Sequence, residues 1–161
     1  MTTTLTLRVP APLPLSANQR LHHAPKAQRV KTLRNAAELA ARGMTFPDPA
    51  HLTVRIGWPN KIRRDAHNAI PTIKAQIDGF VRAGALADDS DAHLLGPDLR
   101  PHIAGKKGVV VLTYIFRPAI TCTFCDELSQ EWCYREQNHC RECIPRCHVC
   151  VEETQIERNA S

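Results

Sequence analysis

The chain has 161 residues, of which 43% are hydrophobic and 23% charged, and its formal net charge is +5. This length predicts one domain, with room for a small appendage. No apolar run approaches the length of a membrane span, which excludes a membrane-spanning protein and predicts a soluble globular one. The N-terminus lacks the basic start and apolar core of a signal peptide, so we expect a cytoplasmic location.

The charge is unevenly distributed. Residues 1–121 hold 17 Lys and Arg against 8 Asp and Glu, whereas residues 122–161 hold 4 against 8. A basic body suits a phosphate backbone, because each neutralised phosphate releases counterions. Aromatic residues make up only 5%, which favours contact with a duplex backbone over base stacking. The alternative is an ordinary, mildly basic soluble domain.

The hydrophobic pattern predicts strands and helices in alternation. Residues 2–9 alternate as a half-buried strand, and a proline-rich loop follows over 10–16. A helix is predicted over 25–42, closed by Gly43, and a second strand over 51–58. Pro71 suits the first turn of another helix and Gly84 its end, with apolar residues at three- and four-residue spacing between them.

After this helix the pattern is less regular. Residues 93–95 form a short apolar piece, 96–98 predict a turn, and 105–108 predict a basic bend. Residues 109–116 form the strongest strand, whose near-continuous apolarity predicts a central or doubly covered position. The order of strands and helices predicts an α+β domain with a mixed β-sheet and two main helices.

Acidic residues flank the second helix. Asp65 precedes it, Lys74 and Asp78 lie four apart on one face, and Asp88 and Asp89 follow it. Mg²⁺ is usually bound by one or two carboxylates with water and substrate phosphate, and a nearby lysine can stabilise charge on a scissile phosphate. The pattern therefore indicates metal-assisted phosphodiester cleavage. The alternative is a solvated acidic loop with a surface ion pair between Lys74 and Asp78.

Two stretches resemble the RusA family of Holliday junction endonucleases, and especially its actinobacteriophage versions. The first runs from Arg63-Arg64-Asp65 through Pro71-Thr72 and Lys74 to Asp88-Asp89. The second is the Asn-x-Arg-x-His element at residues 18–22, preceded by Leu-Pro-Leu-Ser. The resemblance covers residues 5 to 117. It implies a RusA-like endonuclease domain over 1–120, acting as a homodimer that needs Mg²⁺ or Mn²⁺ and cuts four-way DNA junctions symmetrically.

The resemblance also assigns roles to residues. It implies catalytic roles for Asp65, Lys74 and Asp89. One departure is His67, which stands where better-known members carry a second aspartate. The candidate ligands of the catalytic metal are therefore Asp65, Asp89, Asp88, His67 and Asp78. The candidate DNA contacts are Asn18, Arg20, His22, Arg29, Arg34, Arg63, Arg64 and Asn68.

The C-terminal part differs from the rest because it holds every cysteine of the chain. Three Cys-x2-Cys pairs predict a zinc-binding module over 121–151, whereas disulfides are rare in cytosolic proteins and an odd cysteine count fits them poorly. One or two structural zinc ions are expected. The candidate zinc ligands are Cys122, Cys125, Cys133, His139, Cys140, Cys143, Cys147 and Cys150.

The pairing of these ligands stays open, because His148 could replace His139 and Cys133 could be a bystander. Residues 152–161 are expected to be a disordered tail. The acidic charge of the module favours a contact with a protein partner or a brace between two subunits rather than DNA. No contact with a membrane is expected.

Two function hypotheses follow. The first is a magnesium-dependent endodeoxyribonuclease that resolves four-way junctions in recombination, DNA repair or phage DNA processing, in the cytoplasm of the host. The second is a non-catalytic, structure-specific DNA-binding protein whose zinc module recruits a protein partner. His67 supports this hypothesis, because it stands in place of a second aspartate. A RING-like ligase is a weaker third reading, because treble-clef and ribbon modules share the same cysteine spacing.

Overall fold

The computed structural model describes residues 1–60, 62, 64–103, 108–121 and 128–129. The chain divides into two compact units, Met1–Arg117 and Pro118–Ser161. In the second unit, the described residues form a short antiparallel pair of β5 (Ile120–Thr121) and β6 (Leu128–Ser129). The cysteines and histidines of the predicted zinc module, the tail over 152–161 and the basic part of the bend at 105–107 lie outside the described residues.

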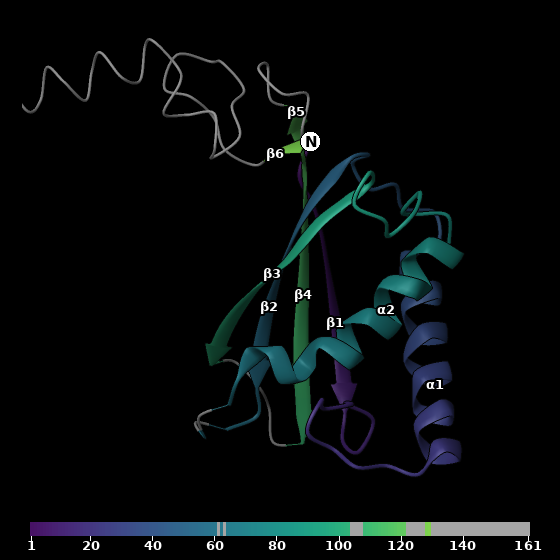
Figure 1. Ribbon diagram of the computed structural model, residues 1–161, viewed down its shortest axis with the longest axis vertical. Coiled ribbons are helices and arrows are strands. Elements are labelled where there is room, and N and C mark those ends of the chain that lie inside the picture. Colours follow the sequence, from purple (N-terminus) through teal and green to yellow (C-terminus); the bar gives the residue numbers. More distant parts are fainter. Residues whose placement is uncertain (61, 63, 104–107, 122–127, 130–161) are drawn as a thin grey trace, which may run out of the picture. The chain divides into compact units, whose positions relative to one another are not determined.

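The first unit is built on a four-stranded mixed sheet (Figure 1). Its strands are β1 (Thr3–Pro10), β2 (Ala50–Trp58), β3 (Leu94–Ile103) and β4 (Val109–Pro118). Their spatial order is β1-β4-β2-β3, with β1 antiparallel to β4 and β2 parallel to β3. The predicted α+β class, the mixed sheet and the central position of β4 are therefore confirmed.

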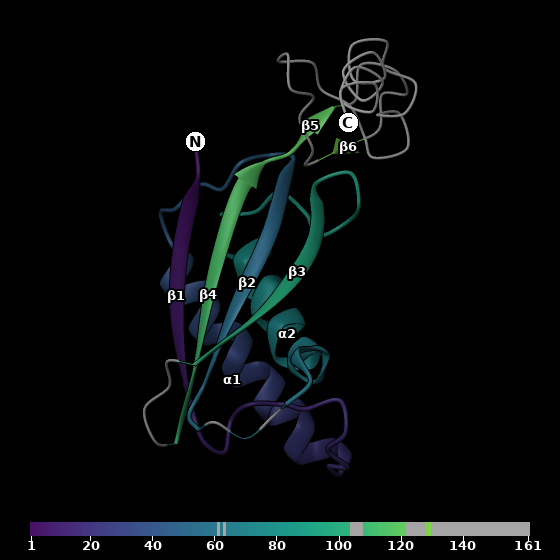
Figure 2. The ribbon, with the colours of Figure 1, turned by 90° about the vertical axis from the view of Figure 1, so that its left-hand side faces the viewer.

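Two helices lie on one face of this sheet (Figure 2). They are α1 (His23–Ala41) and α2 (Ile70–Arg82), and a single 3-10 turn, η1 (Ala66–Ala69), leads into α2. Pro71 lies in the first turn of α2, where its missing N–H costs no hydrogen bond. Gly84 just beyond α2 has a φ of +70°, as its predicted role in ending the helix requires.

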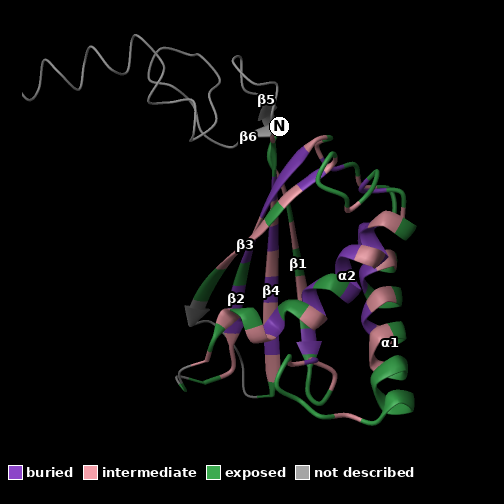
Figure 3. Cartoon of the chain, viewed as in Figure 1, coloured by how far each residue is buried: buried purple, intermediate pink, exposed green. Residues whose placement is uncertain are grey.

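The core lies between the sheet and the helices (Figure 3). Alternate residues of β4 are buried, and four aromatic rings gather there. Phe46 stacks on Phe116 with ring centroids 3.9 Å apart, while Phe80 from α2 meets Phe46, Phe116 and Tyr114 edge-on. The buried Tyr114 hydroxyl donates a hydrogen bond to the Gln76 side chain of α2. These contacts fix α2 against the centre of the sheet.

The two helices approach each other closely at Gly79 of α2. A Cβ built on Gly79 would lie 2.4 Å from the carbonyl oxygen of Arg34 and 2.8 Å from the Cβ of Ala37. Only glycine fits such an approach without moving one helix away from the other. The contact brings the polar side chains of α1 within reach of those of α2. No helix in the described ranges is both long and apolar enough to cross a membrane.

The turn predicted at 96–98 is wrong, because these residues lie within β3. The pairing with β2 shifts register here, since His51 pairs with Leu95 but Thr53 pairs with Asp98. Gly96 has a φ of +102°, and a Cβ on it would lie 2.7 Å from the carbonyl oxygen of Leu52. The glycine and proline therefore form an irregularity in an edge strand, where a missing N–H is tolerated.

Candidate functional site

Three elements bring charged side chains together around Lys74. Its ammonium lies 3.0 Å from Oδ1 of Asp78 and also contacts the carboxylate of Asp89, in the loop after α2. The other oxygen of Asp78 lies 3.5 Å from Nη2 of Arg34 on α1. Positive and negative charges therefore alternate along Arg34, Asp78, Lys74 and Asp89. We call these four residues the ion-pair cluster.

The cluster is partly open to solvent, because the Lys74 side chain is 57% exposed and that of Asp89 is 29% exposed. Ion pairs at such sites add little to stability. Their clearest effect is to hold the ammonium of Lys74 in one place. The sequence predicted the pairing of Lys74 with Asp78 from their spacing, but it gave no sign that Arg34 completes the cluster.

The loop that carries Asp89 is organised by Asp88. One carboxylate oxygen of Asp88 accepts a hydrogen bond of 2.8 Å from the backbone N–H of Asp89, and the other accepts one of 2.9 Å from the Ser90 hydroxyl. The carbonyl oxygen of Ser90 in turn accepts hydrogen bonds from the N–H groups of His93 and Leu94, where β3 begins. Asp88 thus shapes the loop and fixes the backbone of Asp89.

Asp65 lies at the N-cap of η1. Its Oδ1 accepts a 2.9 Å hydrogen bond from the backbone N–H of His67 and lies 3.1 Å from Nδ1 of the same residue. The backbone hydrogen bond, helped by the His67 side chain, holds the pKa of Asp65 below its ordinary value. The side chain is 63% exposed, so it presents an ionised carboxylate to solvent.

The loop between β1 and α1 is fastened to this helical segment at two points. The buried Thr72 hydroxyl accepts a 2.7 Å hydrogen bond from the N–H of Leu15 and donates one of 2.8 Å to its carbonyl oxygen. The N–H of Ala17 donates to the carbonyl oxygen of Asn68 at 3.0 Å. These bonds hold the start of the loop against the segment that follows Asp65. The predicted DNA contacts Asn18, Arg20 and His22 are among the exposed residues of this loop.

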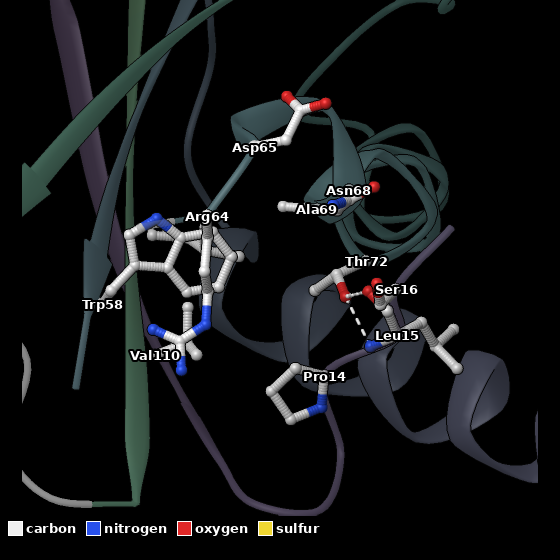
Figure 4. A pocket seen from close by; sticks show the side chains of 11 residues that line it. Pro14, Leu15, Ser16, Trp58, Arg64, Asp65, Asn68, Ala69, Thr72 and Val110 are labelled. Carbon is white, nitrogen blue, oxygen red and sulfur yellow. Dashed lines mark hydrogen bonds between the residues drawn. The ribbon is translucent and has the colours of Figure 1, made fainter. Parts of the chain in front are cut away.

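Asp65 also lies at the edge of a cavity of about 340 Å³ (Figure 4). Trp58 from the end of β2 forms one wall, and the guanidinium of Arg64 lies 5.1 Å from the centre of its ring. Arg64 is also held by a 2.6 Å hydrogen bond to the Asn60 side chain. The sequence predicted roles for Arg64 and Asn68 but none for Trp58, whose only sequence signal is its position before the Arg-Arg-Asp stretch.

A second hollow, of about 520 Å³, lies between α1 and α2. Its lining is mostly basic. The basic or titratable residues that line it are His23, Lys26, Lys31, Arg34 and Arg82. We call this hollow the basic groove. Arg34 belongs both to the basic groove and to the ion-pair cluster, so the two surfaces are continuous. Arg29, also predicted to contact DNA, is half-buried on α1 and does not line the groove, and Arg63 lies outside the described residues.

The predicted metal ligands fall into separate contacts. Asp65 contacts His67. Asp78 and Asp89 both contact Lys74, and Asp88 forms hydrogen bonds within its own loop. Within the described ranges, no three His, Cys, Asp or Glu side chains form a group that could hold a metal ion. The arrangement fits an ion held by one or two carboxylates with water and substrate, the usual environment of Mg²⁺. It does not form a closed protein cage.

Comparisons with known proteins give no family assignment. No family model matches the chain, and no curated protein matches it significantly. Among solved structures, the chain is similar to thiamine-monophosphate kinase from Stenotrophomonas maltophilia K279a, with 16% identity and a TM-score of 0.23. The match covers 72% of this chain but only 30% of the kinase. A similarity this low supports no conclusion about fold or function.

Proposed function

We propose that the protein is a metal-dependent endodeoxyribonuclease that cuts four-way DNA junctions, as the resemblance to the RusA family implies. The observation that carries the proposal is the position of Lys74, whose ammonium is held between two carboxylates on the segment that begins with the exposed, ionised Asp65. Lysine and carboxylates near one another on an open surface suit the cleavage of a phosphodiester, whose transition state gathers negative charge.

Asp65 and Asp89 are the proposed ligands of Mg²⁺ or Mn²⁺. His67 meets only Oδ1 of Asp65, and Lys74 meets only Oδ2 of Asp89, so each carboxylate keeps an oxygen outside these contacts. The bound ion would supply an activated water and neutralise charge on the scissile phosphate. Lys74 would contribute a positive charge to the same phosphate, while Asp78 and Arg34 position its ammonium.

The basic surfaces supply the DNA contacts in this proposal. The groove between α1 and α2 adjoins the ion-pair cluster through Arg34, so a strand held there would lead towards Lys74. The loop with Asn18, Arg20 and His22 is fastened to the segment that follows Asp65. Contacts of this kind position the backbone without reading its sequence. A homodimer would present two such sites to the two halves of a junction.

The test is cleavage of a labelled four-way junction, with a linear duplex of the same sequence as the substrate control. We expect paired symmetric nicks in the junction alone, with Mg²⁺ or Mn²⁺. Asp65→Asn and Lys74→Met should each lower the rate by about 10²- to 10³-fold, as the loss of one transition-state contact does. Asp91→Asn is the matched control, because this exposed aspartate lies in the same loop as Asp89.

One observation favours a second candidate, a DNA-binding protein without cleavage. His67 replaces a possible second carboxylate and meets Asp65, which leaves fewer oxygen ligands for a metal. Under this alternative, the predicted zinc module would recruit a protein partner. Tight binding of the junction with no cut in either metal, and no effect of Lys74→Met on binding, would contradict the nuclease and favour this alternative.

A further inference from the structure

The cavity beside Asp65 has a lining that the proposed cleavage chemistry does not use. Val110 and Leu112 of the central strand are apolar and buried, and Trp58 contributes an indole ring. In Figure 4, Trp58 and Arg64 lie on one side of the cavity, and Thr72 and Ser16 lie on the other. A cavity of about 340 Å³ is at the small end of the range for ligand sites, so it suits one small group.

Two polar groups of this lining have no partner within the described part of the chain. The Nε1–H of Trp58 is buried without a hydrogen bond, which is costly for a donor shielded from water. The half-buried side-chain amide of Asn68 is also without a hydrogen bond among the described residues, although its backbone carbonyl accepts one from Ala17. An amide offers both donors and acceptors, the pattern needed for the edge of a heterocyclic base.

The chemistry of the lining narrows the ligand class. A phosphate site would need several donors or cations, whereas this lining is mostly apolar with one guanidinium. A purely apolar ligand would leave Arg64 and Asn68 unused. A nucleobase meets both requirements, because its faces stack on aromatic rings and guanidinium planes while its edge hydrogen-bonds to amides. The guanidinium of Arg64 already lies over the ring of Trp58, 5.1 Å from its centre.

We propose that this cavity binds one unpaired nucleobase. The assignment of that base to a DNA strand rests on the proposed function, because Asp65 at the edge of the cavity would then lie next to the nucleotide to be cut. A base inside a duplex cannot enter such a cavity, whereas an unstacked base at a branch point can. The cavity would therefore contribute both to the choice of branched substrates and to sequence preference at the cut.

Binding of the base can be measured without cleavage. Trp58 becomes the only tryptophan in a Trp132→Phe background, and Trp132 lies outside the described residues. Without added Mg²⁺ or Mn²⁺, we expect deoxynucleoside monophosphates to change the Trp58 fluorescence saturably, and deoxyribose 5-phosphate, which lacks a base, to have no effect. An equal response to deoxyribose 5-phosphate, or no response to any nucleotide, would overturn the proposal.

Two variants and two matched controls locate the base in this cavity. Val110→Phe places a phenyl ring in the cavity and Asn68→Ala removes the amide, so each should weaken binding about tenfold or more. Ile115→Phe places the same ring on the opposite face of the same strand, and Asn35→Ala removes the amide of an exposed residue of α1. Both control variants should therefore bind nucleotides as tightly as the parent protein does. Equal affinity in all four variants would contradict the proposal, and thermal melting shows whether each variant is folded.

A junction with 2-aminopurine at its branch point separates this proposal from the proposed function. We expect its fluorescence to rise when the protein binds, because the base leaves the stack, and to stay low with Val110→Phe. Binding of nucleotides and junction without cleavage in either metal would keep the cavity assignment and contradict the nuclease. Cleavage of the junction without any response of Trp58 or 2-aminopurine would keep the nuclease and contradict the cavity assignment.

Discussion

Replacing Gly79 by alanine tests the close packing of α1 and α2. The added Cβ would lie 2.4 Å from the backbone oxygen of Arg34, about 1 Å inside ordinary van der Waals contact. Because the obstacle is backbone, the helices must separate, and overpacking of this kind costs about 1–3 kcal/mol. Alanine is favoured over glycine within a helix by about 1 kcal/mol, which offsets part of this cost. Because the overlap is with backbone, we expect an overpacking cost of about 3 kcal/mol and therefore a net loss of stability of about 2 kcal/mol.

The loss is measured by urea denaturation and by thermal melting. For a unit of this size, about 2 kcal/mol lowers the melting temperature by roughly 8 °C. Gly84→Ala is a useful control, because a Cβ there meets nothing within 4 Å, although its φ of +70° adds strain. If Gly79→Ala instead stabilised the protein by about the 1 kcal/mol of helix propensity, the close approach of the two helices would be refuted.

Two further predictions concern single side chains. Thr72→Val leaves the N–H and C=O of Leu15 without their partner, so we expect a loss of about 2 kcal/mol in urea denaturation, against almost none for Thr32→Val on the surface of α1. Burial lowers the pKa of His51 despite Asp98 at 3.4 Å, so the unfolded chain binds the proton more tightly. Stability should therefore fall as the pH drops below about 6.5, and His51→Gln should reduce that fall in melting temperature; an unchanged pH profile would contradict this sign.

Local patterns predicted most of the framework. Alternation identified β1 and β2, and the positions of Pro71 and Gly84 bracketed α2, because helix ends depend on the local backbone. β3 was missed because Gly96, Pro97 and Pro101 usually interrupt strands. Only its place at the edge of the sheet, beside β2, makes these residues acceptable there, and that place is a property of the whole fold.

The candidate site was also predicted only in part, because local spacing reveals contacts within one helix but not contacts between distant segments. Spacing along one helix predicted that Lys74 meets Asp78, and resemblance singled out Asp89. The partner of Asp78 on α1 depends on how the helices pack at Gly79, which no local pattern encodes. The cavity beside Trp58 likewise combines residues from the N-terminal loop, β2, η1 and β4, which are distant in sequence. The roles assigned to these residues remain predictions for the experiments above.

The order of strands has a consequence for how the protein is made. β4 lies between β1 and β2, although it is synthesised after both of them and after both helices. Until residues 109–118 leave the ribosome, β1 has no strand to pair with. The apolar faces of both helices then have no central strand to pack against. Chains that expose apolar surface during synthesis are prone to aggregation. We therefore expect the first unit to fold late in translation, in one step that begins when β4 inserts.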